Sequence, residues 1–233
     1  MKTKLKIPTH SLISEVENRM RAQFAGNPSY LVSTLDQLIV AGGKHIRPNI
    51  ILLIGSMFEA EQEALLNLAA AIEMMHTATL VHYDLVDETD QRRGYPTINA
   101  RFTTSATVLA GDLAFAAAAK LAAAVKSIPV MQNFSETLQF IVNGEITYMF
   151  NDGGQGGQEA YYDWIHAKTA SVFELAAGLA ATLGSANQAE IDAAYQFGYN
   201  IGMAFQITDD VLDFSNNPQH ACRLHRIIAA HVN

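Results

Sequence analysis

The stretch LVHYDLVDETDQRRG, residues 80–94, joins the end of an apolar run to a dense group of charges. Four of the seven residues from 84 to 90 carry carboxylates, and two arginines and a glycine follow them. Neighbouring carboxylates repel one another unless a cation lies among them. The stretch therefore predicts a site for a positively charged partner at the end of an apolar segment.

A second acidic group, QITDDVLDF, lies at residues 206–214. Asp209 and Asp213 are four residues apart, so in a helix both carboxylates project from one face. Magnesium prefers oxygen ligands and usually bridges one or two carboxylates to the phosphates of a substrate. A solvated acidic face is the alternative for either group. Apolar residues flank both groups, which favours a magnesium site.

Basic residues supply a complement to these acids. AGGKHIRP, residues 41–48, places Lys44 and Arg47 just after two glycines, and Arg92 and Arg93 follow the first acidic group. Arginine and lysine side chains suit phosphate oxygens. Each basic pair alone could be a surface salt-bridge partner. Together with the two acidic groups, they predict a site for two phosphate-bearing substrates.

Composition sets outer limits on the function. The 233 residues are 49% hydrophobic and carry a formal charge of -8, which argues against general binding of nucleic acid. The single cysteine, Cys222, cannot form an intramolecular disulfide, and the first residues hold no apolar core of signal-peptide length. We expect a cytoplasmic protein. The apolar run 113–125 contains Lys120 and is too short for a membrane span, so no transmembrane segment is expected.

Apolar residues recur at spacings of three and four, which predicts an all-α protein. Proline and glycine clusters separate the expected helices, and no run of alternating β-branched residues competes with them. One domain over residues 1–214 is the economical interpretation, with a tail at 215–233. The expected helices span residues 11–25, 29–41, 45–58, 62–90, 101–125, 130–150, 159–184 and 188–214.

Six stretches together make the chain resemble a trans-type polyprenyl diphosphate synthase of the long-chain type. The resemblance implies the isoprenoid synthase fold, a helical bundle around a central apolar cavity, and a homodimer. The stretches occur in the order and at the spacing of that family. They are GGKHIRP (42–48), MMHTATLVHYDLVDETDQRRGYPTINA (74–100), VLAGDLAFA (108–116), NGE (143–145), KTAS (168–171) and FQITDDVLDF (205–214).

The resemblance also implies substrates, a cofactor and residue roles. The reaction would condense isopentenyl diphosphate with an allylic diphosphate in the presence of Mg²⁺. Taken singly, His76, Thr169 and Gln206 could instead be polar groups that are satisfied within a helix or between packed helices. Isopentenyl diphosphate would bind to Lys44, Arg47, His76 and Arg93; the allylic diphosphate to Arg92, Lys168, Thr169 and Gln206; and the metal to Asp84, Asp87, Asp209 and Asp213.

Two departures from the family pattern bear on turnover. The first acidic motif of the family begins with paired aspartates after a histidine, whereas this chain has Tyr83 before Asp84. A neutral phenol is a poor magnesium ligand, and Asp84 lies about 100° further round the helix. The residues after Phe214 match none of the family's C-terminal helices. A truncated or frameshifted tail is the first explanation, and a short natural variant is the second.

Other functions stay open beside the enzyme. A non-catalytic partner subunit of a heteromeric synthase would also account for Tyr83 and the tail. A terpene cyclase uses acidic groups on helices, but it needs no second diphosphate site, so Lys44, Arg47 and His76 count against it. The small residues Ala78 and Thr79 resemble an open shaft for a growing chain, which predicts products of about six or more isoprene units. Close helix packing would explain the same alanine.

Overall fold

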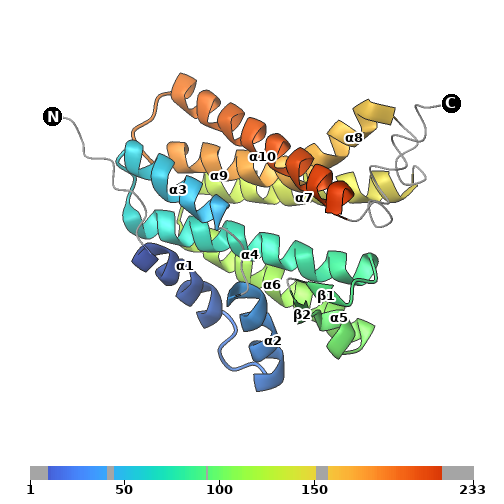
Figure 1. Cartoon of the computed structure of the whole chain (residues 1–233). Coiled ribbons are helices and arrows are strands. Elements are labelled where there is room, and N and C mark those ends of the chain that lie inside the picture. The colour runs from blue at the N-terminus through green and yellow to red at the C-terminus, as the bar shows by residue number, and fades with distance from the viewer. Residues whose placement is uncertain (1–9, 41–44, 93, 151–156, 217–233) are drawn as a thin grey trace. The chain divides into compact units, whose positions relative to one another are not determined.

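The computed structural model describes residues 10–40, 45–92, 94–150 and 157–216 of the chain. These residues form helices joined by short connections, with one two-stranded hairpin (Figure 1). The predicted all-α fold is confirmed. The chain divides into two compact units, residues 1–131 with 179–186 and residues 132–178 with 187–233. We refer to them as the first and second units.

The first unit is built around one long helix, α4, which runs from Gln62 to Val86. Its residues from 69 to 72 are all fully buried, as a helix must be when it is apolar on every side. The largest helix contact of α4 is with α6, where buried alanines allow the two helices to approach closely. The other elements of this unit are α1 (His10–Ala22), α2 (Ser29–Val40), α3 (Ile46–Met57), β1 (Gln91–Arg92), β2 (Tyr95–Pro96), α5 (Ile98–Arg101) and α6 (Thr104–Ala124).

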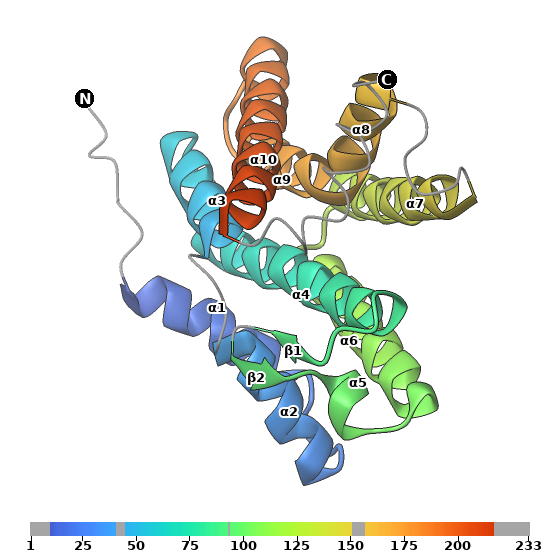
Figure 2. The same ribbon diagram turned by 45° about the vertical axis from the view of Figure 1, so that its right-hand side comes forward.

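The expected helix over 62–90 ends four residues early. Asp87 caps α4, and Glu88 takes a positive φ of 50°, which the right-handed helix does not allow. The chain then forms the antiparallel β1–β2 hairpin, in which Arg92 pairs with Tyr95 (Figure 2). The charged residues after Val86 thus lie in a turn and a hairpin, while Asp84 lies within α4.

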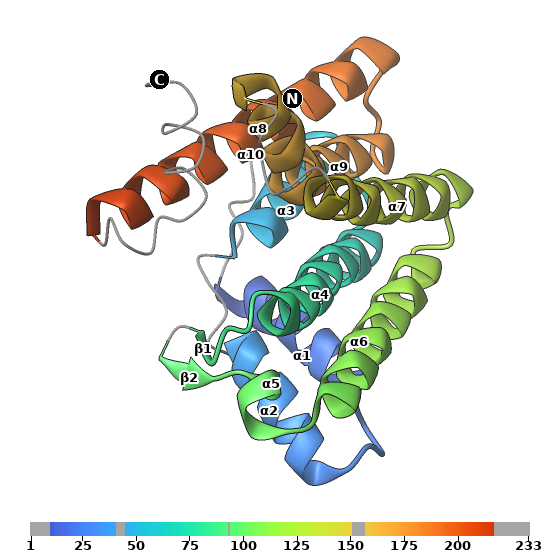
Figure 3. The same cartoon turned by 90° about the vertical axis from the view of Figure 1, so that its right-hand side faces the viewer.

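The second unit contains most of α7 (Ile128–Phe150), together with α8 (Gly157–Ile165) and α10 (Gln188–Asn216) (Figure 3). The helix expected over 159–184 is interrupted: α8 leads into a π-helical turn at His166–Ala170, called the π-turn below, and α9 (Ser171–Thr182) follows. Single π-helical turns within α-helices occur frequently at functional sites.

Two glycines allow neighbouring helices to contact the π-turn closely. A Cβ atom added at Gly144 of α7 would lie 2.4 Å from the Cβ of Ala167, and one added at Gly202 of α10 would lie 2.5 Å from the Cα of Ala170. Neither glycine could be replaced by a larger residue without displacement of the helices. The NGE motif of α7 therefore positions the π-turn from one side, and α10 positions it from another.

Two helices in the described part of the chain, α4 and α6, are long and apolar enough to cross a membrane by length and composition alone. The core helices of soluble proteins meet the same criteria. In the apolar 18-residue segment of α4, 72% is buried inside the protein, and in the corresponding segment of α6 44% is buried. The predicted lack of a transmembrane segment stays a prediction, and the burial of α4 favours it.

Candidate functional site

The acidic end of α4 is held against the hairpin by an ion pair. The Nε and Nη2 atoms of Arg92 lie 2.8 and 2.7 Å from Oδ1 of Asp84, whose side chain is only 2% exposed. Thr97 fastens the hairpin to the end of the helix, because its hydroxyl donates to the carbonyl oxygen of Thr89 at 2.8 Å. The fold therefore joins a predicted metal ligand, Asp84, to a predicted diphosphate ligand, Arg92.

Burial and the ion pair act on Asp84 in opposite directions. Desolvation raises the pKa of the Asp84 carboxyl group, and this effect exceeds the lowering caused by Arg92. A carboxylate removed from water is costly unless a cation compensates it, so the pair depends on both partners. In this arrangement one oxygen of Asp84 is engaged by Arg92.

The neighbours of Asp84 face different surroundings. Asp87 is exposed at the cap of α4, and its N–H donates to the carbonyl oxygen of Tyr83 at 2.8 Å. Tyr83 is half-buried, and its hydroxyl oxygen is shielded from solvent. Of the two predicted metal ligands at the acidic end of α4, Asp87 is therefore the one better placed to reach an ion from solvent.

The predicted site for isopentenyl diphosphate is only partly described. Lys44 and Arg93 lie outside the described residues. Arg47 is buried in the first turn of α3, and His76 of α4 lines a narrow pocket together with His45 and Glu73. The structure thus places two of the four predicted ligands in the first unit.

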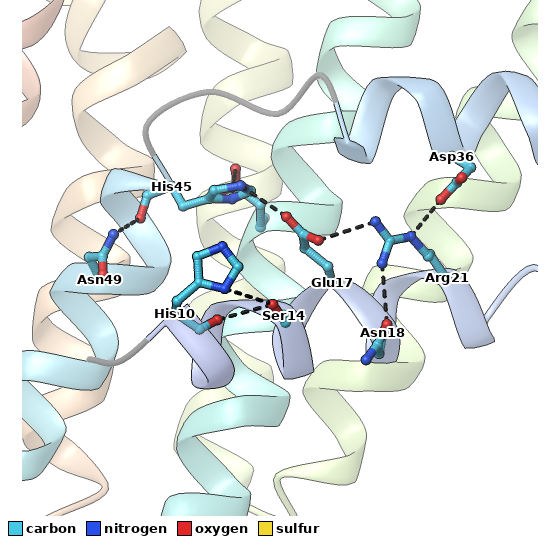
Figure 4. A network of polar contacts seen from close by, with 9 residues as sticks. His10, Ser14, Glu17, Asn18, Arg21, Asp36, His45 and Asn49 are labelled. Carbon is cyan, nitrogen blue, oxygen red and sulfur yellow. Dashed lines mark hydrogen bonds and ion pairs between the residues drawn. The ribbon is translucent and has the colours of Figure 1, made fainter.

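A polar network fixes the residue that precedes α3. His45 has a positive φ of 44°, and its Nε2 atom lies 3.1 Å from Glu17 of α1 (Figure 4). The other carboxylate oxygen of Glu17 contacts Arg21 at 3.1 Å, and Arg21 contacts Asp36 of α2 at 2.5 Å. Side chains of α1 and α2 therefore hold the backbone that leads into Arg47.

The second unit brings two predicted diphosphate ligands together. Thr169 of the π-turn donates its hydroxyl hydrogen to Oε1 of Gln206 at 2.6 Å. Gln206 in turn donates from Nε2 to Oδ1 of Asp210 at 2.9 Å. The family resemblance assigns Thr169 and Gln206 to one substrate, and the fold places them in direct contact.

Lys168, the third predicted ligand in this unit, is held by α7. Its Nζ atom lies 3.0 Å from Oε1 of Glu145 and 4.8 Å from the ring centre of Trp164. The indole N–H of Trp164 donates to the same Glu145 oxygen at 3.2 Å. Sequence reasoning gave Glu145 and Trp164 no role, although Glu145 belongs to the quoted NGE motif.

Tyr161 of α8 is a further residue that the sequence did not single out. Its hydroxyl donates to Oδ2 of Asp210 at 2.6 Å. Burial, with a smaller contribution from the Asp210 carboxylate, raises the pKa of the Tyr161 phenol far above its usual range. The phenol therefore keeps its proton and acts as a donor. Only the adjacent helices reveal this role, because nothing in the local sequence separates Tyr161 from Tyr162.

The metal ligands predicted on α10 differ from Asp210. Asp209 and Asp213 are exposed, whereas Asp210 is half-buried. Among the described residues, no three or more His, Cys, Asp or Glu side chains converge as a metal site. Exposed carboxylates one turn apart fit a cation that shares its coordination with substrate phosphates and water. They do not fit a cage built by protein alone.

The chain-length residues lie in the core of the first unit. Ala78 is fully buried in α4, and Thr79 is buried beside it. The Thr79 hydroxyl donates to the carbonyl oxygen of His76 at 2.7 Å, which satisfies it within the helix. Both side chains are small and buried, as an open shaft requires, but close helix packing would bury them equally.

Comparison with known families shows which family the chain belongs to. Residues 28–223 match the model of a family described as Polyprenyl synthetase. The chain belongs to this family. The resemblance inferred from the sequence motifs is therefore confirmed.

Curated relatives agree with the family. The chain is 38% identical over 187 residues to the octaprenyl diphosphate synthase of Escherichia coli, covering 79% of this chain and 58% of that protein. It is 37% identical over 183 residues to the octaprenyl diphosphate synthase of Haemophilus influenzae, covering 78% of this chain and 56% of that protein. The chain thus spans less than two thirds of the length of these relatives.

Solved structures share the fold. A decaprenyl diphosphate synthase from Rhodobacter capsulatus superimposes with a TM-score of 0.82 at 31% identity, over 88% of this chain and 63% of that one. A polyprenyl synthase from Caulobacter crescentus, complexed with calcium and isoprenyl diphosphate, gives 0.83 at 30% identity over the same shares. The predicted isoprenoid-synthase-like bundle is confirmed.

Proposed function

We propose that this chain is a magnesium-dependent prenyltransferase, which condenses isopentenyl diphosphate with an allylic diphosphate to build a polyprenyl diphosphate. The contact of Thr169 with Gln206, beside Lys168 on the π-turn, is the observation that carries the proposal. Two adjacent predicted ligands of one diphosphate, Lys168 and Thr169, lie on the π-turn, and the third, Gln206, comes from the helix packed against it, 37 residues away in sequence. The calcium and isoprenyl diphosphate in the related Caulobacter structure support the same class of ligand.

The proposed chemistry follows from the charges of the side chains. In the second unit, Lys168 would stabilise negative charge on the departing diphosphate as the allylic carbon–oxygen bond breaks. The double bond of isopentenyl diphosphate then attacks the allylic cation, a carbon–carbon bond forms, and a proton is lost. Magnesium, when bound, would supply further charge stabilisation at the diphosphate. The exposed carboxylates predicted as metal ligands are Asp87 in the first unit and Asp209 and Asp213 in the second, while Asp84 would contribute only after partial release from Arg92.

The direct test is turnover by the purified chain. Labelled isopentenyl diphosphate is incubated with farnesyl or geranylgeranyl diphosphate and Mg²⁺, and the products are dephosphorylated and separated by chain length. We expect elongated products that disappear when a chelator removes the metal. A folded protein that forms no product from either allylic substrate would overturn the proposal.

Long products are part of the proposal, because Ala78 and Thr79 present small side chains on α4. Ala78→Phe should shorten the product distribution, since a preformed channel absorbs the added ring only at a cost of about 1–3 kcal/mol. Chromatography of the dephosphorylated products measures the change. The same distribution from a variant that still melts cooperatively would place the floor of the channel elsewhere.

The assembly and setting of the enzyme are also proposed. Residues up to 214 form the synthase region, which acts in the cytoplasm as a homodimer. The half-exposed Val142, Ile146 and Met149 of α7 share one helix face and offer an apolar surface to a second copy. Sedimentation equilibrium tests the dimer, and a purely monomeric species at micromolar concentration would contradict it.

A further inference from the structure

Three hydrogen bonds in the second unit link four side chains in series. Tyr161 of α8 donates to Asp210, Gln206 donates to the other oxygen of Asp210, and Thr169 of the π-turn donates to Gln206. The three distances are 2.6, 2.9 and 2.6 Å. We call these residues the Tyr161 chain. It connects α8, α10 and the π-turn within one unit.

The backbone makes this connection possible. Gly198, Gly202, Gln206 and Asp210 follow one another at intervals of four residues, so they form a single stripe along α10. A Cβ at Gly198 would lie 2.4 Å from the carbonyl oxygen of Phe173, and one at Gly202 would lie 2.5 Å from the Cα of Ala170. The glycines bring α10 against the π-turn and α9, and the polar half of the stripe then meets Thr169 and Tyr161.

The hydrogen bonds all point towards Asp210. Its two oxygens both act as acceptors, one for the phenol of Tyr161 and one for the amide of Gln206. The amide group is thereby oriented with its nitrogen towards Asp210 and its oxygen towards Thr169. Reversal of the amide would place its oxygen against a carboxylate oxygen, so the orientation of Gln206 depends on where Asp210 is held.

Asp210 also differs from the two carboxylates beside it. Asp209 and Asp213 are exposed, while Asp210 is half-buried and engaged on both oxygens. The acidic group of α10 therefore contains two carboxylates directed to solvent and one directed to protein. The carboxylate directed to protein has a structural partner, Tyr161, that lies 49 residues away in sequence.

We propose that Tyr161 is a positioning residue, which through Asp210 fixes the side-chain amide of Gln206 and the hydroxyl of Thr169 for the allylic diphosphate. The substrate part of this inference rests on the proposed function, whereas the orientation of Gln206 does not. Tyr161 itself touches no reacting atom. It acts by holding Asp210 in the position from which the two predicted diphosphate ligands are aligned.

Tyr161→Phe tests the inference, because it removes only the hydroxyl and keeps the ring. The neighbouring Tyr162→Phe is the matched control. Tyr162 is 40% exposed, and its hydroxyl accepts a hydrogen bond from Gln158 of the same helix at 2.9 Å. A general effect of losing a phenol from α8 would appear in both variants, whereas an effect through Asp210 would appear only at position 161.

The first measurement needs no turnover. The side-chain amide resonances of Gln206 are recorded in ¹⁵N-labelled free protein and identified by their absence in Gln206→Met. We expect them to shift in Tyr161→Phe and to stay in place in Tyr162→Phe. Unchanged resonances in Tyr161→Phe would overturn the inference, even if the enzyme is active. If the wild-type chain proves inactive, the proposed function fails, and this measurement still decides the orientation of Gln206.

The second measurement is steady-state kinetics. A hydrogen bond to a charged group is lost, so kcat/KM for the allylic diphosphate should fall about tenfold or more in Tyr161→Phe. The KM for isopentenyl diphosphate should change less than about twofold. In a Gln206→Met background the same substitution should cause little further loss, because its effect passes through Gln206. Equal losses in both backgrounds, or a loss confined to isopentenyl diphosphate, would contradict the inference.

Discussion

At the scale of single residues, each acidic group contains one carboxylate that is bound by protein side chains and others that are exposed to solvent. Asp84 is buried against Arg92 and Asp210 is held by Tyr161 and Gln206, while Asp87 is exposed in the same group as Asp84. The carboxylates could be recognised in the sequence, but their partners could not. Arg92 reaches Asp84 through a hairpin, and Tyr161 reaches Asp210 through helix packing. Neither contact follows from local spacing.

Tyr83 occupies the position one turn before the exposed Asp87, where the family pattern has an acid. We expect Tyr83→Asp to raise kcat by at least about a hundredfold, because an added metal ligand acts on the charge that develops on the leaving group. Single-turnover and steady-state assays with saturating Mg²⁺ measure the change. Tyr83→Asn is the control, because asparagine has the shape of aspartate without its charge. A folded aspartate variant that is no faster would show that the missing acid does not limit turnover.

The ion pair between the buried Asp84 and the half-buried Arg92 should lose more stability when its cation alone is removed than when both charges are removed. Arg92→Met leaves Asp84 buried without its cation, so it should lower the free energy of unfolding by about 3 kcal/mol. Adding Asp84→Asn to that variant should recover part of the loss, because the uncompensated charge is removed. Urea denaturation of the two single variants and the double variant measures the coupling. Strictly additive losses would mean that the two side chains do not interact in solution.

At the scale of helices, apolar periodicity predicts which segments are helical but not where each helix ends. The expected helix over 62–90 matches α4 up to Val86 because its apolar residues recur on every side. It ends there because Glu88 takes a positive φ and the chain turns into the hairpin. The π-turn inside the segment 159–184 could not be predicted from local sequence either. Its close neighbours, Gly144 and Gly202, come from other helices.

Gly202→Ala tests the close contact between α10 and the π-turn. Helix propensity alone would favour alanine by about 0.8–1.0 kcal/mol. The added Cβ would however lie 2.5 Å from the Cα of Ala170, a backbone atom that cannot move aside alone. We expect the contact to prevail, with a net destabilisation of about 1–3 kcal/mol and weaker binding of the allylic diphosphate. Thermal melts and substrate affinities measure both. A variant as stable as the wild type, with unchanged affinity, would contradict the packing.

At the scale of the whole molecule, the fold class and family could be predicted from six short motifs. The motifs are spread from residue 42 to residue 214, and the family match covers residues 28–223. Their order and spacing carry information that no single motif holds. The division of the chain into two compact units was not predicted, because it depends on contacts between residues distant in sequence. Each unit carries predicted ligands for both a cation and a diphosphate.

Metal binding should be visible as stability of the whole chain. A ligand that binds only the folded state stabilises it by about 2.7 kcal/mol at a hundredfold excess over its Kd. For a chain of this length, that should raise the thermal midpoint by roughly 5–10 °C. We therefore expect Mg²⁺ with inorganic diphosphate to shift the melting curve, and Asp209→Ala to abolish the shift, since Asp209 is an exposed acid of the second group.

A matched variant separates coordination from general charge in this experiment. Asp192→Ala removes the same charge from an exposed position nearer the start of α10, so it should leave the shift intact. If Asp209→Ala keeps the full shift, Asp209 does not hold the metal, and Asp213 and Asp87 become the remaining exposed candidates among the predicted ligands. If both variants lose it equally, the long-range field of α10 attracts Mg²⁺ without coordination at Asp209. Higher ionic strength would then weaken the wild-type shift, because salt screens exposed charges beyond about 10 Å at 0.1 M.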